Sequence, residues 1–252
     1  MASIELNGMG VSFPVYDQSS RSLKQRIISA TTGGRIESDA HSGKISVVRA
    51  LDGVTLSFRH GDRVGLVGHN GAGKTTLLRV LAGIYEPTTG TARIEGHVAP
   101  LFDVALGMDP ESTGYENIVL RGLFLGLSHQ EIDARVDEIA EFTELGNFLN
   151  LPIRTYSAGM RMRLAFAVST SIEPDILLLD EGIGAGDASF LDKARVRLEE
   201  FTKKAAIIVL ASHSEVLIKQ MCDTAVLMEH GRVLAEGSTD EILQAYRQRA
   251  AG

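Results

Sequence analysis

Residues 68–75 read Gly68-His69-Asn70-Gly71-Ala72-Gly73-Lys74-Thr75. The glycines allow a tight turn whose N–H groups point inward, and such a loop at the start of a helix suits a phosphate group. Lys74 supplies a positive charge for the β- and γ-phosphates of a nucleotide, and Thr75 offers a hydroxyl to Mg²⁺. A buried strand over 64–67 and a helix over 75–82 are predicted on either side. The predicted nucleotide-binding residues are Gly68, His69, Asn70, Gly71, Ala72, Gly73, Lys74, Thr75 and Thr76.

An acidic pair, Asp180 and Glu181, follows four apolar residues at 176–179. Such a run predicts a central strand that carries the two carboxylates at its C-terminal end. Asp180 is expected to hold Mg²⁺, directly or through water, and Glu181 to act as the catalytic base that accepts a proton from the attacking water. The alternative for Glu181 is a solvated acid in a loop. Its place beside Asp180 and after a phosphate loop favours the catalytic interpretation.

The composition is that of an ordinary globular protein. The chain has 252 residues; 44% are hydrophobic, 23% are charged, and the formal net charge is −7. This acidic balance argues against nucleic acid as a partner. The single cysteine, Cys222, excludes an internal disulfide bond. The N-terminus has no signal-peptide pattern and no apolar run reaches the length of a membrane span, so the chain is expected to be soluble.

Predicted strands and helices alternate along the C-terminal half, which indicates a mostly parallel sheet covered on both faces. The predicted strands there are 176–180, 206–211 and 224–228, and the predicted helices are 188–203, 214–221 and one that begins at Thr239. Another helix is expected from Ser128, which Glu131 helps to cap, with one apolar face formed by Ile132, Val136, Ile139 and Phe142.

The N-terminal part is less regular. Two short strand pieces are expected around residues 4–6 and 11–13, and a longer strand over 47–58. Between them, residues 17–44 are rich in Ser, Thr, Gly and charge, with an expected flexible middle over 31–43.

The string Tyr156-Ser157-Ala158-Gly159-Met160 precedes the acidic pair and begins a predicted helix. Serine is a favoured N-cap, so a plain capped helix is one interpretation. Together with the other two motifs, however, the string resembles the signature of ATP-binding-cassette (ABC) ATPases, usually Leu-Ser-Gly-Gly-Gln, from which Ala158 and Met160 depart. The resemblance covers nearly the whole chain. It is supported by Gly184-Ala185-Gly186-Asp187, by His213 after a strand and by Gly114-Tyr115-Glu116-Asn117.

The resemblance implies an α/β fold and a dimeric mode of action. The fold would be a RecA-like P-loop NTPase core with a parallel sheet, a small N-terminal antiparallel sheet and an inserted helical subdomain near 104–170, all in one nucleotide-binding domain over 1–252. Ser157, Ala158 and Gly159 would bind the ATP held by a partner chain. Asp187 would lie in a dimer-contact loop, and His213 would be the catalytic switch histidine. A homodimer would then close over two molecules of ATP.

The resemblance narrows to the exporters of bacterial surface polysaccharides: O-antigen, capsule and teichoic acid. It rests on 156–160 followed by Arg163-Leu164-Ala165-Phe166-Ala167, on Thr113-Gly114-Tyr115-Glu116-Asn117, and on the interruption at 17–44, a family-specific insertion. By the same resemblance Tyr16 stacks on adenine, the alternative being an exposed tyrosine at a strand end. Most ABC ATPases have a glutamine near Asp103, which is the nearest candidate for that role and for binding Mg²⁺ through water.

The resemblance implies an ATPase subunit that uses ATP and Mg²⁺ to power export of a lipid-linked, O-antigen-like polysaccharide. A polytopic membrane permease would be its partner, and it would sit peripherally on the cytoplasmic face of the inner membrane. One alternative is the ATPase subunit of another ABC importer or exporter. Another is a soluble ABC ATPase of DNA repair or translation; the acidic charge, the lack of a long coiled coil and the single cassette argue against that class.

Residues 21–30 read Arg-Ser-Leu-Lys-Gln-Arg-Ile-Ile-Ser-Ala. As a short helix, this segment would have an apolar edge at Leu23 and Ile27 and basic residues over much of the rest. A basic amphipathic helix suits a membrane surface or the cytoplasmic face of a partner. The alternative is a surface excursion whose apolar edge packs on its own domain.

Overall fold

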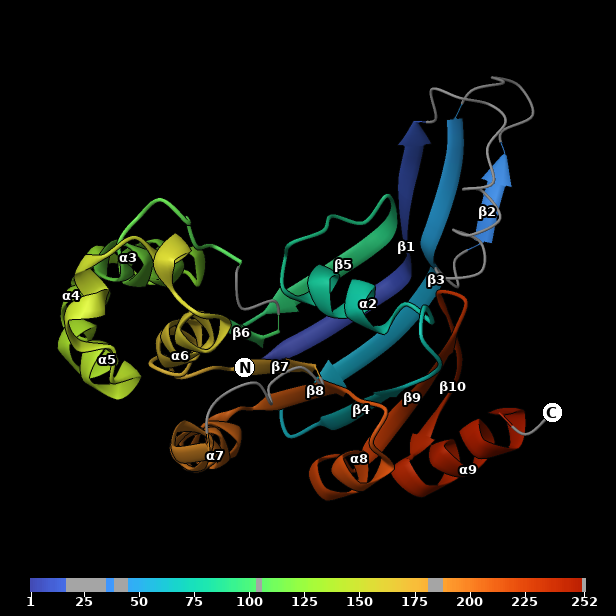
Figure 1. Ribbon diagram of the computed structural model, residues 1–252. Helices are drawn as coiled ribbons and strands as arrows, with labels where there is room; N and C mark the ends of the chain where they lie inside the picture. Colours follow the sequence, from blue (N-terminus) through green and yellow to red (C-terminus); the bar gives the residue numbers. More distant parts are fainter. Residues whose placement is uncertain (17–34, 39–44, 103–105, 181–187, 251–252) are drawn as a thin grey trace. The chain divides into compact units, whose positions relative to one another are not determined.

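The computed structural model describes residues 1–16, 35–38, 45–102, 106–180 and 188–250 (Figure 1). The chain divides into two compact units. Unit 1 consists of Met1–Gly96 together with Ile207–Gly252, and unit 2 consists of His97–Ala206. The polypeptide therefore leaves unit 1, forms unit 2 and returns. The amphipathic segment expected at 21–30 lies outside the described residues.

Unit 1 contains an antiparallel sheet with the strand order β2-β3-β1-β5. Its strands are β1 (Ser3–Tyr16), β2 (Arg35–Ser38), β3 (Ile45–Arg59) and β5 (Thr89–Glu95). The two strand pieces expected near the N-terminus are one strand, because β1 continues past register shifts between Leu6 and Ser12. The middle of 17–44 that was expected to be flexible contains β2, which pairs with β3. The predicted small antiparallel sheet is therefore larger and more continuous than the pattern indicated.

The second sheet of unit 1 is built around β4 (Arg63–Val67). This strand pairs in parallel with β8 (Ile207–Ala211) and with β9 (Thr224–Glu229), and β10 (Arg232–Ser238) runs antiparallel to β9. Four of the five residues of β4 and all five of β8 are buried, as expected for strands covered on both faces. Because β4, β8 and β9 are parallel, their C-terminal ends meet at one edge of the sheet.

Three helices cover this sheet. Helix α2 (Lys74–Leu81) packs against β8 and also against β3 and β5, so it lies between the two sheets of unit 1. Helices α8 (Glu215–Met221) and α9 (Thr239–Ala250) pack on the opposite face of β4 and β9 (Figure 1). The predicted α/β fold with a parallel sheet is confirmed. Among the described residues, no helix is both long and apolar enough to cross a membrane.

Cys222 lies at the end of α8 in the core of unit 1, 6% exposed, where a Cβ added to Gly65 would be 3.6 Å from its Sγ. Burial, with a smaller effect of Asp223, raises the pKa of the Cys222 thiol to about 12. The structure therefore keeps the thiol protonated well above neutral pH.

We expect the folded protein to react slowly with an aromatic disulfide reagent at pH 8, because the thiolate is the reactive form and Cys222 is both buried and protonated. The same reagent should label one thiol per chain after unfolding in guanidinium chloride. Between about pH 9 and 12 the unfolded state loses this proton first, so the stability contributed by the thiol falls as pH rises. Fast stoichiometric labelling of the native chain would contradict this prediction.

Unit 2 pairs two parallel strands, β6 (Val98–Leu101) and β7 (Ile176–Asp180), and is otherwise helical in its described part. Its helices are α3 (Gly114–Phe124), α4 (His129–Asp133), α5 (Val136–Thr143), α6 (Ala158–Ser169) and α7 (Ala188–Lys204), with 3₁₀ turns η1 (Gly146–Asn150) and η2 (Ile153–Thr155). Helix α6 packs against α3 and α5. The rings of Phe142, Phe166 and Phe190, contributed by α5, α6 and α7, have centroids 5.7 to 6.1 Å apart.

The helix expected from Ser128 is two helices, α4 and α5. Ser128 does cap the first, and Glu131 completes the capping box as predicted. The break falls at Arg135, whose φ of −116° departs from helical geometry and whose side chain donates to the carbonyls of Glu131 and Ser171. The apolar spacing continues across the break, which is why the pattern suggested a single helix.

Candidate nucleotide-binding site

The glycine-rich loop 68–73 connects the end of β4 to the start of α2. Gly73 caps the helix with a φ of +104°, a conformation that favours glycine. At Gly68 space is limiting, because a Cβ there would lie 2.3 Å from the carbonyl oxygen of Met228. The predicted strand–loop–helix context is therefore present, and the backbone of neighbouring segments leaves room only for glycine at Gly68.

Lys74 begins α2 and turns its side chain back over the loop. Its Nζ donates to the carbonyl oxygen of Gly68 at 2.5 Å and to that of His69 at 3.2 Å, and the residue is 8% exposed. Thr75 follows with an exposed side chain, and Thr76 is half-buried. A positive charge, a hydroxyl and the N-terminus of a helix thus lie together at the sheet edge. This is the arrangement that binds the phosphates of a nucleotide.

The turn between β9 and β10 holds the phosphate loop in place through backbone hydrogen bonds. The N–H of Gly231 donates to the carbonyl of Ala72 at 3.0 Å, and the N–H of Asp52 donates to the carbonyl of Gly231 at 2.9 Å. Asp52 also pairs with Arg232, which lowers the pKa of its carboxyl group. The sequence analysis missed this support. The one local sign of this turn in the sequence is the dipeptide His230-Gly231, and both residues have positive φ in the structure.

His213 lies in the segment that follows β8, and its side chain is exposed. Leu66 of β4 pairs with Ala211 of β8. The phosphate loop begins two residues after Leu66, and His213 lies two residues after Ala211. The parallel register therefore brings His213 to the same sheet edge as the loop. The switch role expected of His213 stays a prediction.

Asp180 is the last residue of β7 in unit 2; it is half-buried, whereas the rest of β7 is buried. Glu181, Asp187 and Asp103, the predicted base, dimer-loop residue and metal ligand, lie outside the described residues. Tyr16 ends β1, opposite Ile45 of β3, and its side chain also lies outside the described part. The roles expected of these residues stay predictions.

Ser157 is the N-cap of α6, and its Oγ accepts the N–H of Met160 at 3.1 Å. Ser157 and Ala158 are exposed. A Cβ added to Gly159 would find a single neighbour within 4 Å, the Oγ of Ser157 at 3.8 Å. The N-terminus of α6 therefore has an exposed hydroxyl and open space beside its backbone. These are the features expected of a helix N-terminus that binds a phosphate group held by another chain.

A family model described as "ABC transporter" matches residues 51–184, more than half of the chain. The chain belongs to the ABC transporter family. The family predicted from the three motifs is thereby confirmed, and with it the ATP-binding and ATP-hydrolysing class of the protein.

Three curated relatives within the family are similar to this ABC protein over most of its length. It is 47% identical to the O-antigen export system ATP-binding protein RfbE of Yersinia enterocolitica, over 94% of this chain and 98% of that one. It is 40% identical to RfbB of Myxococcus xanthus, with the same description, over 90% of this chain and 51% of that one. It is 38% identical to the teichoic acids export ATP-binding protein TagH of Lactococcus lactis, over 79% of this chain and 42% of that one.

Solved ABC structures share the fold at low identity. The dimeric ATP-binding cassette MJ0796, in a post-hydrolysis state bound to ADP and Pi, superposes with a TM-score of 0.65 at 19% identity over 94% of this chain and 98% of that one. The ATP-binding subunit of an ABC transporter gives a TM-score of 0.66 at 22% identity over 98% and 94%.

In this ABC protein, the motif at 113–117 packs against Tyr156, the residue before the N-cap of α6, because Gly114 lies beside the Tyr156 hydroxyl. Thr113 and Glu116 form a capping box at the start of α3. The side chain of Asn117, which is buried, accepts the N–H of Asp109 and donates to three carbonyls of the loop 109–113. Tyr156 donates its hydroxyl to the carbonyl of Phe148 at 2.6 Å, and burial raises its pKa. The two strings that the sequence analysis treated separately thus belong to one packed region.

Gly114 and Gly159 provide a matched pair of substitutions in this region. A Cβ on Gly114 would lie 2.4 Å from the Tyr156 hydroxyl and 2.9 Å from the Cα of Leu149. We therefore expect Gly114→Ala to lower the free energy of unfolding by roughly 1–3 kcal/mol through overpacking. Gly159→Ala has room and should leave stability unchanged or raise it by up to about 1 kcal/mol, because alanine favours helix. Urea denaturation of both variants measures the difference; equal stabilities would contradict the packing described.

A hollow of about 450 Å³ in unit 2 is lined by residues that include Arg135, Glu138, Arg197 and Lys204. Two ion pairs lie along it: Arg197 with Glu138 at 2.7 Å and Lys204 with Glu173 at 2.7 Å. The hollow contains no glycine-rich backbone and none of the motif residues. It therefore lacks the features that make the loop of unit 1 the candidate site for the phosphates.

Proposed function

We propose that this chain is the ATP-hydrolysing subunit of a transporter that exports a lipid-linked polysaccharide of the O-antigen type. The observation that carries the proposal is the 47% identity to an O-antigen export ATP-binding protein along 98% of that relative. A further relative carries the same description, and a third exports teichoic acids. The shared feature of these cargoes is a long, hydrophilic polymer. An importer or an exporter of small molecules is the less favoured alternative.

The proposed chemistry divides the motif residues by role. Lys74 and the loop N–H groups neutralise the phosphates of ATP, while Thr75 and Asp180 hold Mg²⁺, with Asp103 as a further candidate ligand. Glu181 takes a proton from the attacking water, and His213 contacts the γ-phosphate region from the end of β8. Tyr16 stacks on the adenine. Three observations support these roles. Lys74 is buried and hydrogen-bonded to the loop, and Thr75 is exposed. The pairing of β4 with β8 brings His213 to the same edge of the sheet as the loop.

We further propose that two copies of the chain act together. Ser157, Ala158 and Gly159 would bind the γ-phosphate of the ATP held by the other copy, and Asp187 would contact that copy. The exposed N-terminus of α6 and the open space beside Gly159 support this proposal. The fold is shared with a cassette solved as a dimer. Two nucleotides would then lie in a twofold arrangement.

A membrane permease completes the proposed transporter. Its support is that the relatives are described as the ATP-binding proteins of export systems, and export across a bilayer needs a membrane-spanning path. The chain would bind that permease peripherally, on the cytoplasmic face of the inner membrane. The segment 21–30 is the proposed contact with the permease or with lipid headgroups.

The test is polymer export in a strain from which the chain has been deleted. We expect lipid-linked polysaccharide to accumulate inside the cell and to disappear from the surface, as measured by gel electrophoresis of extracted polymer and by surface labelling. The wild-type chain should restore export. So should Lys219→Ala, which removes only an exposed ion pair with Asp240. Unchanged surface polysaccharide in the deletion strain would refute this cargo and leave the ATPase assignment standing.

A further inference from the structure

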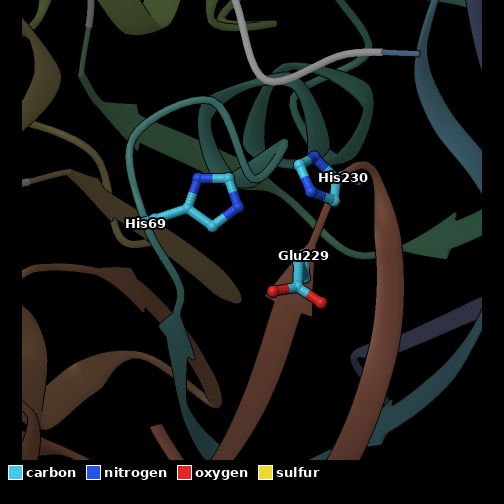
Figure 2. Close-up of side chains that lie close together, drawn as sticks. All are labelled: His69, Glu229 and His230. Carbon is cyan, nitrogen blue, oxygen red and sulfur yellow. The ribbon is translucent and has the colours of Figure 1, made fainter. Parts of the chain in front are cut away.

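Three side chains meet at the phosphate loop: His69, which belongs to the loop motif, and Glu229 and His230, which no motif explains. Each offers one ligand atom, and these atoms all lie within 4.8 Å of one another. Figure 2 shows the three side chains converging, with His69 approaching from the loop and the other two from the end of β9. The two imidazole rings have centroids 5.2 Å apart. His69 and Glu229 are half-buried and His230 is exposed, so an ion can reach the cluster from solvent.

Hydrogen bonding prepares His69 to bind a metal ion. Its Nδ1 lies 2.7 Å from the carbonyl oxygen of Asn70. A carbonyl can only accept, so Nδ1 is the donor in this contact, and Nε2 is the ring nitrogen that remains for an ion. In Figure 2 the far edge of the His69 ring faces His230 and Glu229. A backbone carbonyl that fixes one ring nitrogen of a histidine is the common second contact of metal-binding histidines.

Glu229 completes the ligand set. Its Oε2 accepts from Nη2 of Arg249 at 3.0 Å, which orients the carboxylate. Oε1 is then the oxygen to offer to an ion. Two imidazole nitrogens and one carboxylate oxygen are typical of zinc sites that keep an open fourth position. Mg²⁺ prefers oxygen ligands, so this cluster differs in kind from the proposed magnesium site of the nucleotide.

The backbone holds these ligands close together. Val67 of β4 pairs with Leu227 of β9, and His69 and Glu229 each follow two residues after that pair. Gly231 is bonded to the carbonyl of Ala72 in the phosphate loop at 3.0 Å. The carbonyl of Met228 lies against Gly68. The segments on both sides of the cluster are therefore fixed to each other by backbone contacts that do not depend on the ion.

We propose that His69, Glu229 and His230 form a binding site for a divalent transition-metal ion, of which Zn²⁺ is the best match. The fourth position is open to water or another ligand. Because one ligand belongs to the phosphate loop and two belong to the β9–β10 turn, the bound ion links the loop to the turn. Metal occupancy thereby couples to the conformation of the loop that holds the nucleotide.

The experiment uses the full chain, free of any affinity tag and of nucleotide, titrated with Co²⁺ and then with Zn²⁺. Tetrahedral cobalt gives visible absorption bands, and zinc should displace it with a stoichiometry of one per chain. His230→Ala and Glu229→Gln should each weaken affinity by at least about tenfold. His60→Ala, which removes an exposed histidine from the turn after β3, should leave affinity unchanged.

Two site variants are used so that a folding defect in one of them does not decide the test. Glu229→Gln in particular keeps the size of the side chain and an oxygen that can accept a hydrogen bond. Circular dichroism confirms that each variant is folded. Absence of cobalt bands in the wild-type chain, or equal affinity in the wild type and both folded site variants, would overturn the proposal. The readout is the metal itself. A chain that binds zinc without exporting polysaccharide would refute the proposed cargo and leave this inference intact.

Discussion

Replacing Lys74 by alanine is expected to lower ATP hydrolysis by on the order of 10²- to 10³-fold, the loss typical when one electrostatic partner of the reacting group is removed. The ammonium group is the only side-chain cation within the loop 68–75. It is held over the loop by the carbonyls of Gly68 and His69. Without it, the β- and γ-phosphates lose their main positive charge. Phosphate release and binding of a fluorescent ATP analogue measure the two effects separately.

Lys219→Ala is the matched control for this prediction, because it removes a lysine of unit 1 whose ion pair with Asp240 is exposed. Its hydrolysis rate should equal that of the wild type. Circular dichroism should show that Lys74→Ala keeps its secondary structure, since alanine favours the helix that it begins. A folded Lys74→Ala chain with wild-type turnover would remove Lys74 from the nucleotide site and would place the phosphates elsewhere.

Glu181→Gln is expected to keep ATP binding and to lose about 10²- to 10⁴-fold in turnover, because an amide cannot take the proton of the attacking water. If two copies close over two nucleotides, blocking hydrolysis should also hold the closed state. We therefore expect the variant to form a dimer in the presence of Mg-ATP. Light scattering with and without Mg-ATP, on protein with confirmed bound nucleotide, measures this change in mass.

Full turnover by Glu181→Gln would exclude Glu181 as the base and leave it a solvated acid. A variant that is inactive, saturated with ATP and still monomeric would argue against the shared site. That measurement is repeated with the proposed membrane permease present, which would raise the local concentration of the two copies. A monomer under both conditions would refute the role proposed for Ser157.

The parts of the fold that the sequence predicted are those with a local chemical signature. The loop at 68–75 predicted the strand before it and the helix after it, and the apolar runs predicted β7, β8 and β9. Ser128 and Glu131 predicted a helix start through their capping box. In each case a few adjacent residues both determine the backbone conformation and are visible in the sequence.

The parts that were missed depend on residues far apart in the chain. Strand β10 alternates weakly between exposed and half-buried residues and exists because β9 pairs with it. At the break between α4 and α5, Arg135 donates to the carbonyl of Ser171, which is distant in the chain. Glu229 and His230 belong to no motif, because only the parallel pairing of β4 with β9 brings them to His69 of the phosphate loop. Sequence patterns report local preference, whereas these features are consequences of tertiary pairing.

The parallel partners of β4 have a consequence for how the protein is made. Both of them, β8 and β9, come from beyond residue 206, so on the ribosome the strand that carries the phosphate loop has two unpaired edges until about the last fifth of the chain emerges. Gly231, which supports the loop, is translated later still. A nascent or prematurely terminated chain should therefore be unable to bind ATP. Only chains translated past β9 would then be active as ATPase subunits.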